Sequence, residues 1–312
     1  MSVAVIDLQE FEQGSAAERA RVAAQVDSAC RETGFLVISG HGVPEADIAD
    51  IRQAVAMFFA ASEDIKRDVR AGPGQPYGWL GMGTEALAKS RGEQTPPDLK
   101  ESFNGGPLTR PEGEGDPDAL AFCYAVTPYP RVPGFREAWQ GYYRRMERLA
   151  QQVMALFAVA LGRDAGFFEP YIDAPISALR ALNYPATDRP AEVGQQRAGA
   201  HTDYGSLTIL LPDAGSRGLE ILSPSGEWVP VDAPEGAFVI NIGDLMELWT
   251  GGAWRSTLHR VVVPAELAGR QRASLAFFHQ PNWHAEVRPL EGDGDAVTSG
   301  PYLMAKFAAA TT

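Results

Sequence analysis

The first half of the chain alternates short apolar runs with helical stripes of apolar residues. Residues 3–8 (VAVIDL) and 35–39 (FLVIS) are short, mostly apolar runs of the length expected for strands. Residues 16–33 and 45–60 instead place apolar residues one helical turn apart. A longer helix is predicted over 133–162, where large apolar residues recur at the same spacing from Trp139 to Phe157. The pattern therefore predicts helices that pack against N-terminal strands.

The pattern changes after residue 175, where short β-branched and aromatic runs are separated by Gly, Pro and Asp. Runs such as SLTILL, AFVINI and RASLAFF predict a β-sandwich or barrel. The N-terminal strands need partners, so we expect one fused domain over 1–312. Within it we expect an N-terminal region of helices and loops over 1–120 and a β core over 175–285. The Gly- and Pro-rich stretch 71–120 predicts loops with short strands that help to shape a pocket.

Composition narrows the range of partners. The chain has 27 Lys and Arg against 40 Asp and Glu, a net charge of −13. Such a surface repels phosphate groups, so we expect neither a nucleic-acid nor a membrane partner. The sequence shows no signal-peptide pattern and no long apolar run, which predicts a cytoplasmic protein. Cys30 and Cys123 are too few for a disulfide framework and are expected to be reduced.

Two histidines and one aspartate give the strongest chemical signal. His201 and Asp203 lie two residues apart on chain expected to be extended, so their side chains face the same way. His259 begins the later run HRVVV, which permits its return toward that pair. Two imidazoles and one carboxylate suit non-haem Fe(II), which keeps open positions for further ligands. Zn²⁺ accepts the same residue types, so the three residues alone leave the metal open.

The run RASLAFF predicts a carboxylate-binding site. Arg272 and Ser274 share one face of this strand, and a buried guanidinium needs an anion, which its planar fork matches well. Tyr184 could donate its phenol to the same carboxylate. Arg180 has the same parity as Tyr184 and is either a pocket residue or a surface strand residue. His279 has the opposite parity to Arg272 and is expected to face outward.

In their order along the chain, these motifs resemble the isopenicillin N synthase-like branch of the Fe(II)/2-oxoglutarate dioxygenases. The likeness extends over nearly the whole chain, through ACRETGFLVISGHGVP, DLKESFNGG, LNYP, GAHTDYGSLTIL, FVINIGDLMELWTGG, STLHRVV, RASLAFFHQPN and PYLMAKF. The order is similar in plant hormone oxidases and in the bacterial ethylene-forming enzyme. The resemblance implies a mainly β fold with flanking α-helices and a double-stranded β-helix, or jelly-roll, core.

The resemblance also implies roles for individual residues. The implied iron ligands are His201, Asp203 and His259. The residues implied to hold the distal carboxylate of 2-oxoglutarate are Arg272, Ser274 and Tyr184. Likeness to the ethylene-forming enzyme adds a set that lines the substrate space, namely Glu101, Tyr204 and Phe278.

The implied activity is that of an Fe(II)- and 2-oxoglutarate-dependent dioxygenase. It would use O₂ to hydroxylate, desaturate or cyclise a small molecule, with release of succinate and CO₂. Three alternatives are a 2-oxoglutarate-independent iron oxidase of isopenicillin synthase type, a non-catalytic jelly-roll binder of small molecules, and a zinc hydrolase or isomerase.

Overall fold

A computed structural model describes residues 3–85, 96–186, 196–213, 217–262, 271–292 and 294–311. Most strands of the described chain belong to one large sheet and one small sheet. The large sheet contains β1 (Ala4–Asp7), β2 (Phe35–Ser39), β3 (Gly78–Leu80), β4 (Glu101–Gly105), β5 (Ala178–Tyr184), β7 (Leu207–Pro212), β10 (Phe238–Ile242) and β12 (Arg272–His279). The small sheet contains β6 (Ala198–His201), β8 (Leu219–Leu222), β9 (Trp228–Pro230) and β11 (His259–Val261). A separate pair is formed by β13 (Glu286–Val287) and β14 (Val297–Thr298).

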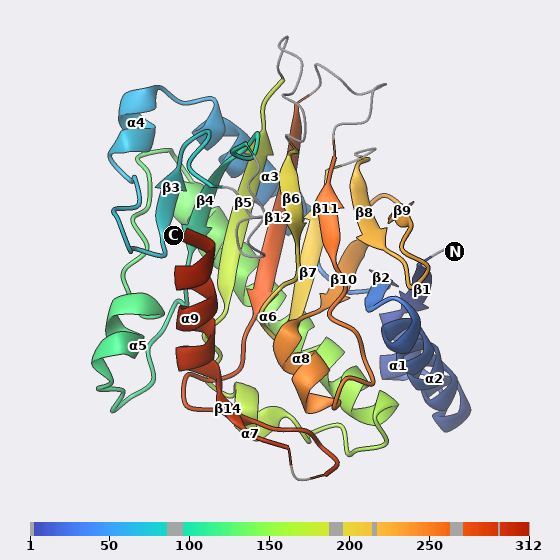
Figure 1. Cartoon of the computed structure of the whole chain (residues 1–312). Coiled ribbons are helices and arrows are strands. Elements are labelled where there is room, and N and C mark those ends of the chain that lie inside the picture. Colours follow the sequence, from blue (N-terminus) through green and yellow to red (C-terminus); the bar gives the residue numbers. More distant parts are fainter. Residues whose placement is uncertain are drawn as a thin grey trace.

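The two sheets form the two sides of a jelly roll (Figure 1). The strand order is β1-β2-β10-β7-β12-β5-β4-β3 in the large sheet and β6-β11-β8-β9 in the small sheet. Both predicted N-terminal strands are present, and β2 pairs antiparallel with β10 of the jelly roll. The predicted fold class, mainly β with flanking helices around a jelly-roll core, is confirmed.

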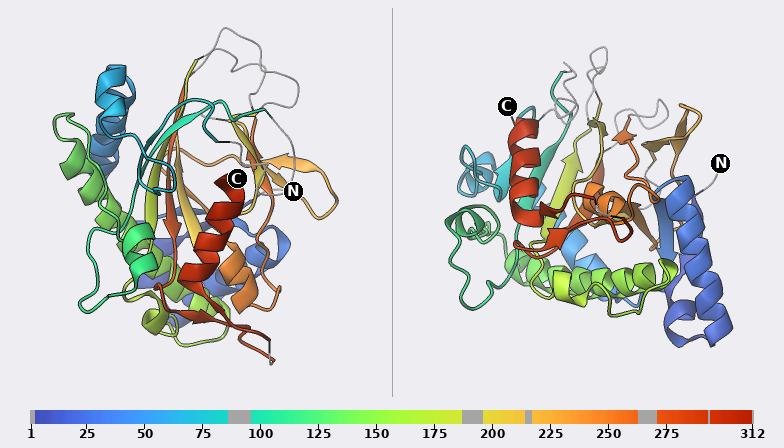
Figure 2. Two further views of the ribbon diagram at one scale, coloured as in Figure 1. Left: turned by 60° about the vertical axis from the view of Figure 1, so that its left-hand side comes forward. Right: turned by 60° about the horizontal axis from the view of Figure 1, so that its bottom comes forward.

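Helices cover the outside of this core. They are α1 (Leu8–Gln13), α2 (Ala16–Glu32), α3 (Glu45–Phe59), α4 (Glu63–Arg67), α5 (Pro117–Phe122), α6 (Phe135–Ala160), α7 (Glu169–Ile172), α8 (Asp244–Trp249) and α9 (Ser299–Thr311). The three helices predicted over 16–33, 45–60 and 133–162 correspond to α2, α3 and α6. The long helix α6 packs against the large sheet, and α9 contacts β14 and reaches the cavity through Leu303 and Phe307 (Figures 1 and 2). In the part of the chain that the structure describes, no helix has the length and apolarity to cross a membrane.

Local sequence sets the boundaries of α2, which leads into the large sheet. Ser15 begins it with a capping box, because its hydroxyl accepts from the Glu18 amide while the Glu18 carboxylate accepts from the Ser15 amide. Gly34 follows its end at φ +67°, a conformation that favours glycine. A Cβ on Gly34 would lie 2.0 Å from the carbonyl oxygen of Arg255. The chain can therefore turn into β2 only with glycine at this position.

Alternation along β5 and β12 separates a helix-facing side from a cavity-facing side. Leu179 and Phe277 belong to the core that includes α6, whereas Leu182 and Phe278 line the cavity between the sheets. His279 points away from that cavity, as its parity predicts, but its side chain is buried. The expectation that it lies at the surface was wrong, because this side of the sheet packs against other elements of the fold and not against solvent.

Candidate active site

Three side chains far apart in sequence converge at one end of the cavity. His201 is the last residue of β6, Asp203 follows in the loop to β7, and His259 is the first residue of β11. The two histidines are direct partners in the antiparallel pair β6–β11. Each of the three residues offers a ligand atom, and these atoms all lie within 4.8 Å of one another. The structure thus brings together the triad that the sequence singles out.

The Asp203 carboxylate is held in one orientation by two neighbours. Its Oδ2 accepts hydrogen bonds from Thr208 Oγ1 at 2.6 Å and from Asn241 Nδ2 at 2.7 Å. Its Oδ1 lies 3.7 Å from His201 Nε2 and 3.8 Å from His259 Nε2. One carboxylate oxygen is therefore fixed by the protein, and the other is left for a cation.

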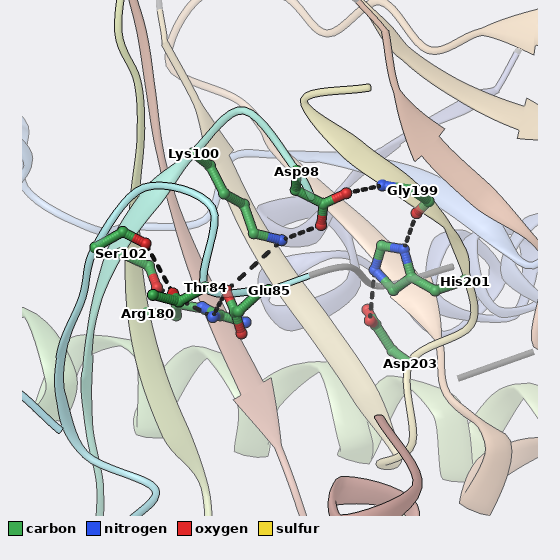
Figure 3. Close-up of polar contacts among 10 residues, drawn as sticks. Thr84, Glu85, Asp98, Lys100, Ser102, Arg180, Gly199, His201 and Asp203 are labelled. Atoms are coloured by element: carbon green, nitrogen blue, oxygen red, sulfur yellow. Dashed lines mark hydrogen bonds and ion pairs between the residues drawn. The ribbon is translucent and has the colours of Figure 1, made fainter. Parts of the chain in front are cut away.

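Backbone carbonyls fix the two imidazole rings. His201 Nδ1 lies 2.7 Å from the carbonyl oxygen of Gly199, and His259 Nδ1 lies 3.0 Å from that of Thr257 (Figure 3 for His201). A carbonyl only accepts, so Nδ1 carries the proton in each ring. Each Nε2 then keeps its lone pair toward Asp203, as a metal ligand requires.

Burial sets the charge of these groups. Desolvation, with the nearby His259, lowers the pKa of His201 to about 3, so its imidazole is neutral near pH 7. Burial alone would raise the pKa of Asp203, but the two histidines and the hydrogen bonds from Thr208 and Asn241 outweigh it and lower that pKa. A neutral imidazole beside an ionised carboxylate is the protonation state that binds a divalent cation.

A second polar site lies on the cavity wall at β12 and β5. Arg272 is paired in register with Tyr184, and its guanidinium carbon lies 5.0 Å from the centre of the Tyr184 ring. Ser274 lies on the same face, and all three residues line the cavity. Arg272 is only 4% exposed, and its Nε and Nη1 have no hydrogen-bond partner within the described chain. A buried guanidinium with unpaired donors fits a carboxylate ligand.

These two sites share one cavity of about 220 Å³. Of the predicted substrate residues, Arg180, Tyr204 and Phe278 line it. Glu101 is absent from the described cavity wall. It pairs with Asn183 on the opposite face of the sheet, where its carboxylate accepts from the Trp79 indole at 2.8 Å and from the Asn183 amide at 2.8 Å.

Several functional neighbours were not predicted from the sequence. Thr208 and Asn241, which orient Asp203, are polar residues inside the apolar runs SLTILL and FVINI, and this interruption is the signal that could have identified them. Leu303 and Phe307 reach the cavity from α9; they lie in PYLMAKF, one of the segments that carry the family resemblance, and in the stretch after Pro281 that the sequence predicts to help shape the pocket, but neither was assigned a role individually. From the stretch 71–120, Tyr77 and other residues line the cavity, while residues 86–95 lie outside the described chain.

The chain matches two family models, one in each half. Residues 3–125 match the N-terminal region of the non-haem dioxygenases described for morphine synthesis. Residues 175–281 match the 2OG-Fe(II) oxygenase superfamily and span the triad and Arg272.

Curated relatives and solved structures agree with these models. Validamycin A dioxygenase from Streptomyces hygroscopicus subsp. limoneus is 33% identical over 93% of this chain and 80% of its own length. Homoarginine-6-hydroxylase 2-ODD-233 from Oryza sativa subsp. japonica is 32% identical over 87% of this chain and 81% of its own. A full-length protein from Neurospora crassa, solved in complex with alpha-KG, matches with a TM-score of 0.85 and 28% identity, covering 98% of this chain and 96% of that chain. A second structure of that protein contains alpha-KG and thymine, with a TM-score of 0.85 and 27% identity over the same shares of the two chains.

Proposed function

Because the chain belongs to the 2-oxoglutarate- and Fe(II)-dependent oxygenases, and is a dioxygenase acting on a small molecule, we propose that its iron is bound by His201, Asp203 and His259. The orientation of Asp203 carries this proposal. Thr208 and Asn241 occupy one carboxylate oxygen, so the other is directed at the two Nε2 atoms. Two imidazoles and one carboxylate form the facial donor set of this enzyme class.

When bound, the iron supplies the oxygen chemistry that converts 2-oxoglutarate to succinate and CO₂ and oxidises the substrate. The protein's part is to hold the reactants and to limit access of water. The two backbone carbonyls keep the Nδ1 protons of the histidines in place, so the ligand atoms need no reorganisation. The cavity lies between two sheets, and apolar side chains such as Leu182, Leu210 and Phe278 line it.

Arg272, Ser274 and Tyr184 are proposed to bind the distal carboxylate of 2-oxoglutarate. In the described part of the chain, Nε and Nη1 of Arg272 have no hydrogen-bond partner, which supports this role because a buried cation is costly without an anion. The Ser274 hydroxyl and the Tyr184 phenol line the same cavity and add neutral donors. The keto acid end of the cosubstrate is left to reach the triad.

The substrate is proposed to contact Arg180, Tyr204 and Phe278. A cavity of about 220 Å³ with mostly apolar walls suits a small molecule that has few polar groups. Arg180 places a positive charge on the β5 wall of this cavity, and that charge is already paired with Glu85. Hydroxylation, desaturation and cyclisation are all compatible with such a pocket.

Charge and cysteine chemistry support a cytoplasmic setting without nucleic-acid or membrane partners. The net charge of −13 opposes binding to phosphate-rich surfaces. Cys30 and Cys123 are free and buried, in keeping with a reducing compartment. Since β1 and β2 extend the large sheet, we also propose that residues 1–312 act as one fused domain, with the jelly-roll core at 175–285.

Anaerobic titration with Fe(II) and then 2-oxoglutarate tests the site assignment. The wild-type protein should bind one Fe(II) and develop a weak visible absorption band on addition of 2-oxoglutarate. Asp203→Ala should lose both properties while it keeps its folded circular dichroism spectrum. A full-strength band in Asp203→Ala would contradict the assignment, and zinc in place of iron with no band would favour the hydrolase or isomerase alternative.

A further inference from the structure

The segment 98–106 (DLKESFNGG) begins with two buried charges that the proposed function leaves unexplained. Asp98 is 3% exposed and Lys100 is 2% exposed. Lys100 Nζ lies 2.9 Å from Asp98 Oδ2 and 3.8 Å from Glu85 Oε2 (Figure 3). Burying such a pair is costly and does not by itself favour stability, so another role is worth seeking.

This pair contacts the strand that ends at His201. Asp98 Oδ1 accepts a hydrogen bond from the Gly199 amide at 3.1 Å, and the Gly199 carbonyl accepts from His201 Nδ1 at 2.7 Å. The Leu99 amide also donates to the carbonyl of Gln196 at 3.0 Å. A continuous path of polar contacts therefore runs from Lys100 through Asp98 and Gly199 to the imidazole (Figure 3).

The position of β6 in its sheet explains why it needs this support. β6 has four residues and is the edge strand of the small sheet, with β11 as its partner in the described chain. Its pairing with β11 is irregular between His259 and Val261. A short edge strand with one irregular ladder is weakly held, so contacts from outside its sheet help to decide where its last residue lies.

The same cluster reaches the substrate side of the cavity. Glu85 pairs with Arg180, and Arg180 also donates to Ser102 Oγ at 3.0 Å. Arg180 and His201 line one cavity. The cluster contains two carboxylates, Asp98 and Glu85, and two cations, Lys100 and Arg180. Their charges cancel, so the cluster adds no net charge beside the triad.

We propose that Asp98, held by Lys100, is a positioning residue for His201: it anchors Gly199 of the edge strand β6 and so fixes the imidazole for Fe(II). This inference rests on the proposed role of His201 as an iron ligand. Groups that orient a metal ligand from behind typically change metal affinity by about 10–100-fold when they are removed.

A second lysine pair in the same part of the fold, between a part-buried lysine and a buried carboxylate, provides a control. Lys66 Nζ lies 3.1 Å from Glu101 Oε2, on the face of the sheet away from the cavity. Lys66→Met and Lys100→Met thus each remove the lysine that pairs with a buried carboxylate, but of the two lysines only Lys100 connects to His201. Asp98→Asn keeps an oxygen that can accept from Gly199, whereas Asp98→Ala does not.

The experiment is an anaerobic Fe(II) titration of the full chain, with the melting temperature of each variant measured in parallel. Lys100→Met and Asp98→Ala should raise the Fe(II) dissociation constant about tenfold or more. Lys66→Met should also lower the melting temperature but change the dissociation constant by less than about threefold, well below that range. Asp98→Asn should fall between wild type and Asp98→Ala.

Equal Fe(II) affinity in Lys100→Met and Lys66→Met would overturn the inference, as would wild-type affinity in Asp98→Ala. If a variant at 98 or 100 does not fold, the double variant Asp98→Asn/Lys100→Met, which buries no unpaired charge from this pair, takes its place with the same expected rise. Titrations of the wild-type protein and of His201→Ala distinguish failure of this inference from failure of the proposed function. Failure of the wild type to bind Fe(II), or tight binding by His201→Ala, would refute the proposed function itself.

Discussion

Replacing Arg272 by lysine separates the charge of this side chain from its geometry. Lysine keeps the positive charge but loses the planar fork that binds both oxygens of a carboxylate. Arg272 is 4% exposed, and its Nε and Nη1 have no hydrogen-bond partner among the residues that the structure describes. The ammonium group of a lysine offers only a single-point contact, so at least one charge-assisted hydrogen bond to 2-oxoglutarate is lost.

The size of the effect follows from that loss. A hydrogen bond to a charged group contributes about 1.5–3 kcal/mol. Since each 1.4 kcal/mol is a factor of ten, a loss of about 2 kcal/mol corresponds to about thirtyfold in affinity. We therefore expect Arg272→Lys to raise the dissociation constant for 2-oxoglutarate about thirtyfold, with Fe(II) affinity close to that of the wild type.

The assay is anaerobic titration of the Fe(II)-loaded protein with 2-oxoglutarate, followed by the visible band. Arg180→Lys is the matched control, because Arg180 lines the same cavity but is already paired with Glu85. It should change the 2-oxoglutarate dissociation constant much less than Arg272→Lys does. Unchanged 2-oxoglutarate affinity in Arg272→Lys would refute the reasoning. An equal loss of affinity in both variants would also refute it, because the loss would then report general damage to the cavity.

Three further predictions concern the triad, its support and pH. His201→Ala, Asp203→Ala and His259→Ala should each abolish Fe(II)-dependent succinate formation while circular dichroism stays native; near wild-type turnover in any of them would remove that residue from the ligand set. Asn241→Leu and Thr208→Val should each weaken Fe(II) binding about tenfold, because each removes one hydrogen bond to Asp203 Oδ2, and calorimetric titration measures this. Burial lowers the pKa of His279 to about 3 from its usual 6.5. Between these two pH values the unfolded state binds more protons than the folded state, so the free energy of unfolding falls as the pH falls through this window. Urea unfolding of His279→Gln between pH 7 and pH 4 should show a weaker fall than the wild type, and an identical pH dependence would contradict this.

The elements were predictable because they depend on local patterns. The helical stripe from Trp139 to Phe157 has one apolar face, and α6 buries that face against the sheet. Parity along β12 likewise indicated that Arg272 and Ser274 share the cavity side. To predict such features it is enough to know the helical or strand period of the sequence and that the two faces of the sheet have different surroundings.

Other features depend on what the fold places opposite a residue. Parity gave the direction of His279 correctly, but the packing of that side of the sheet, which no local pattern contains, makes it buried. Glu101 has the opposite parity to Asn104, which lines the cavity, and the antiparallel register with Asn183 decides that Glu101 faces away. The contacts of Asp98 with Gly199 join segments that are about a hundred residues apart, so they become visible only in the structure.

The central claim is tested most directly by oxygen consumption of the Fe(II)-loaded wild-type protein, measured with and without 2-oxoglutarate and paired with the yield of succinate. The account predicts that oxygen uptake requires 2-oxoglutarate, that succinate forms in step with it, and that both are lost in Asp203→Ala. Oxygen-dependent turnover without 2-oxoglutarate would contradict the account and would favour an oxidase of isopenicillin synthase type.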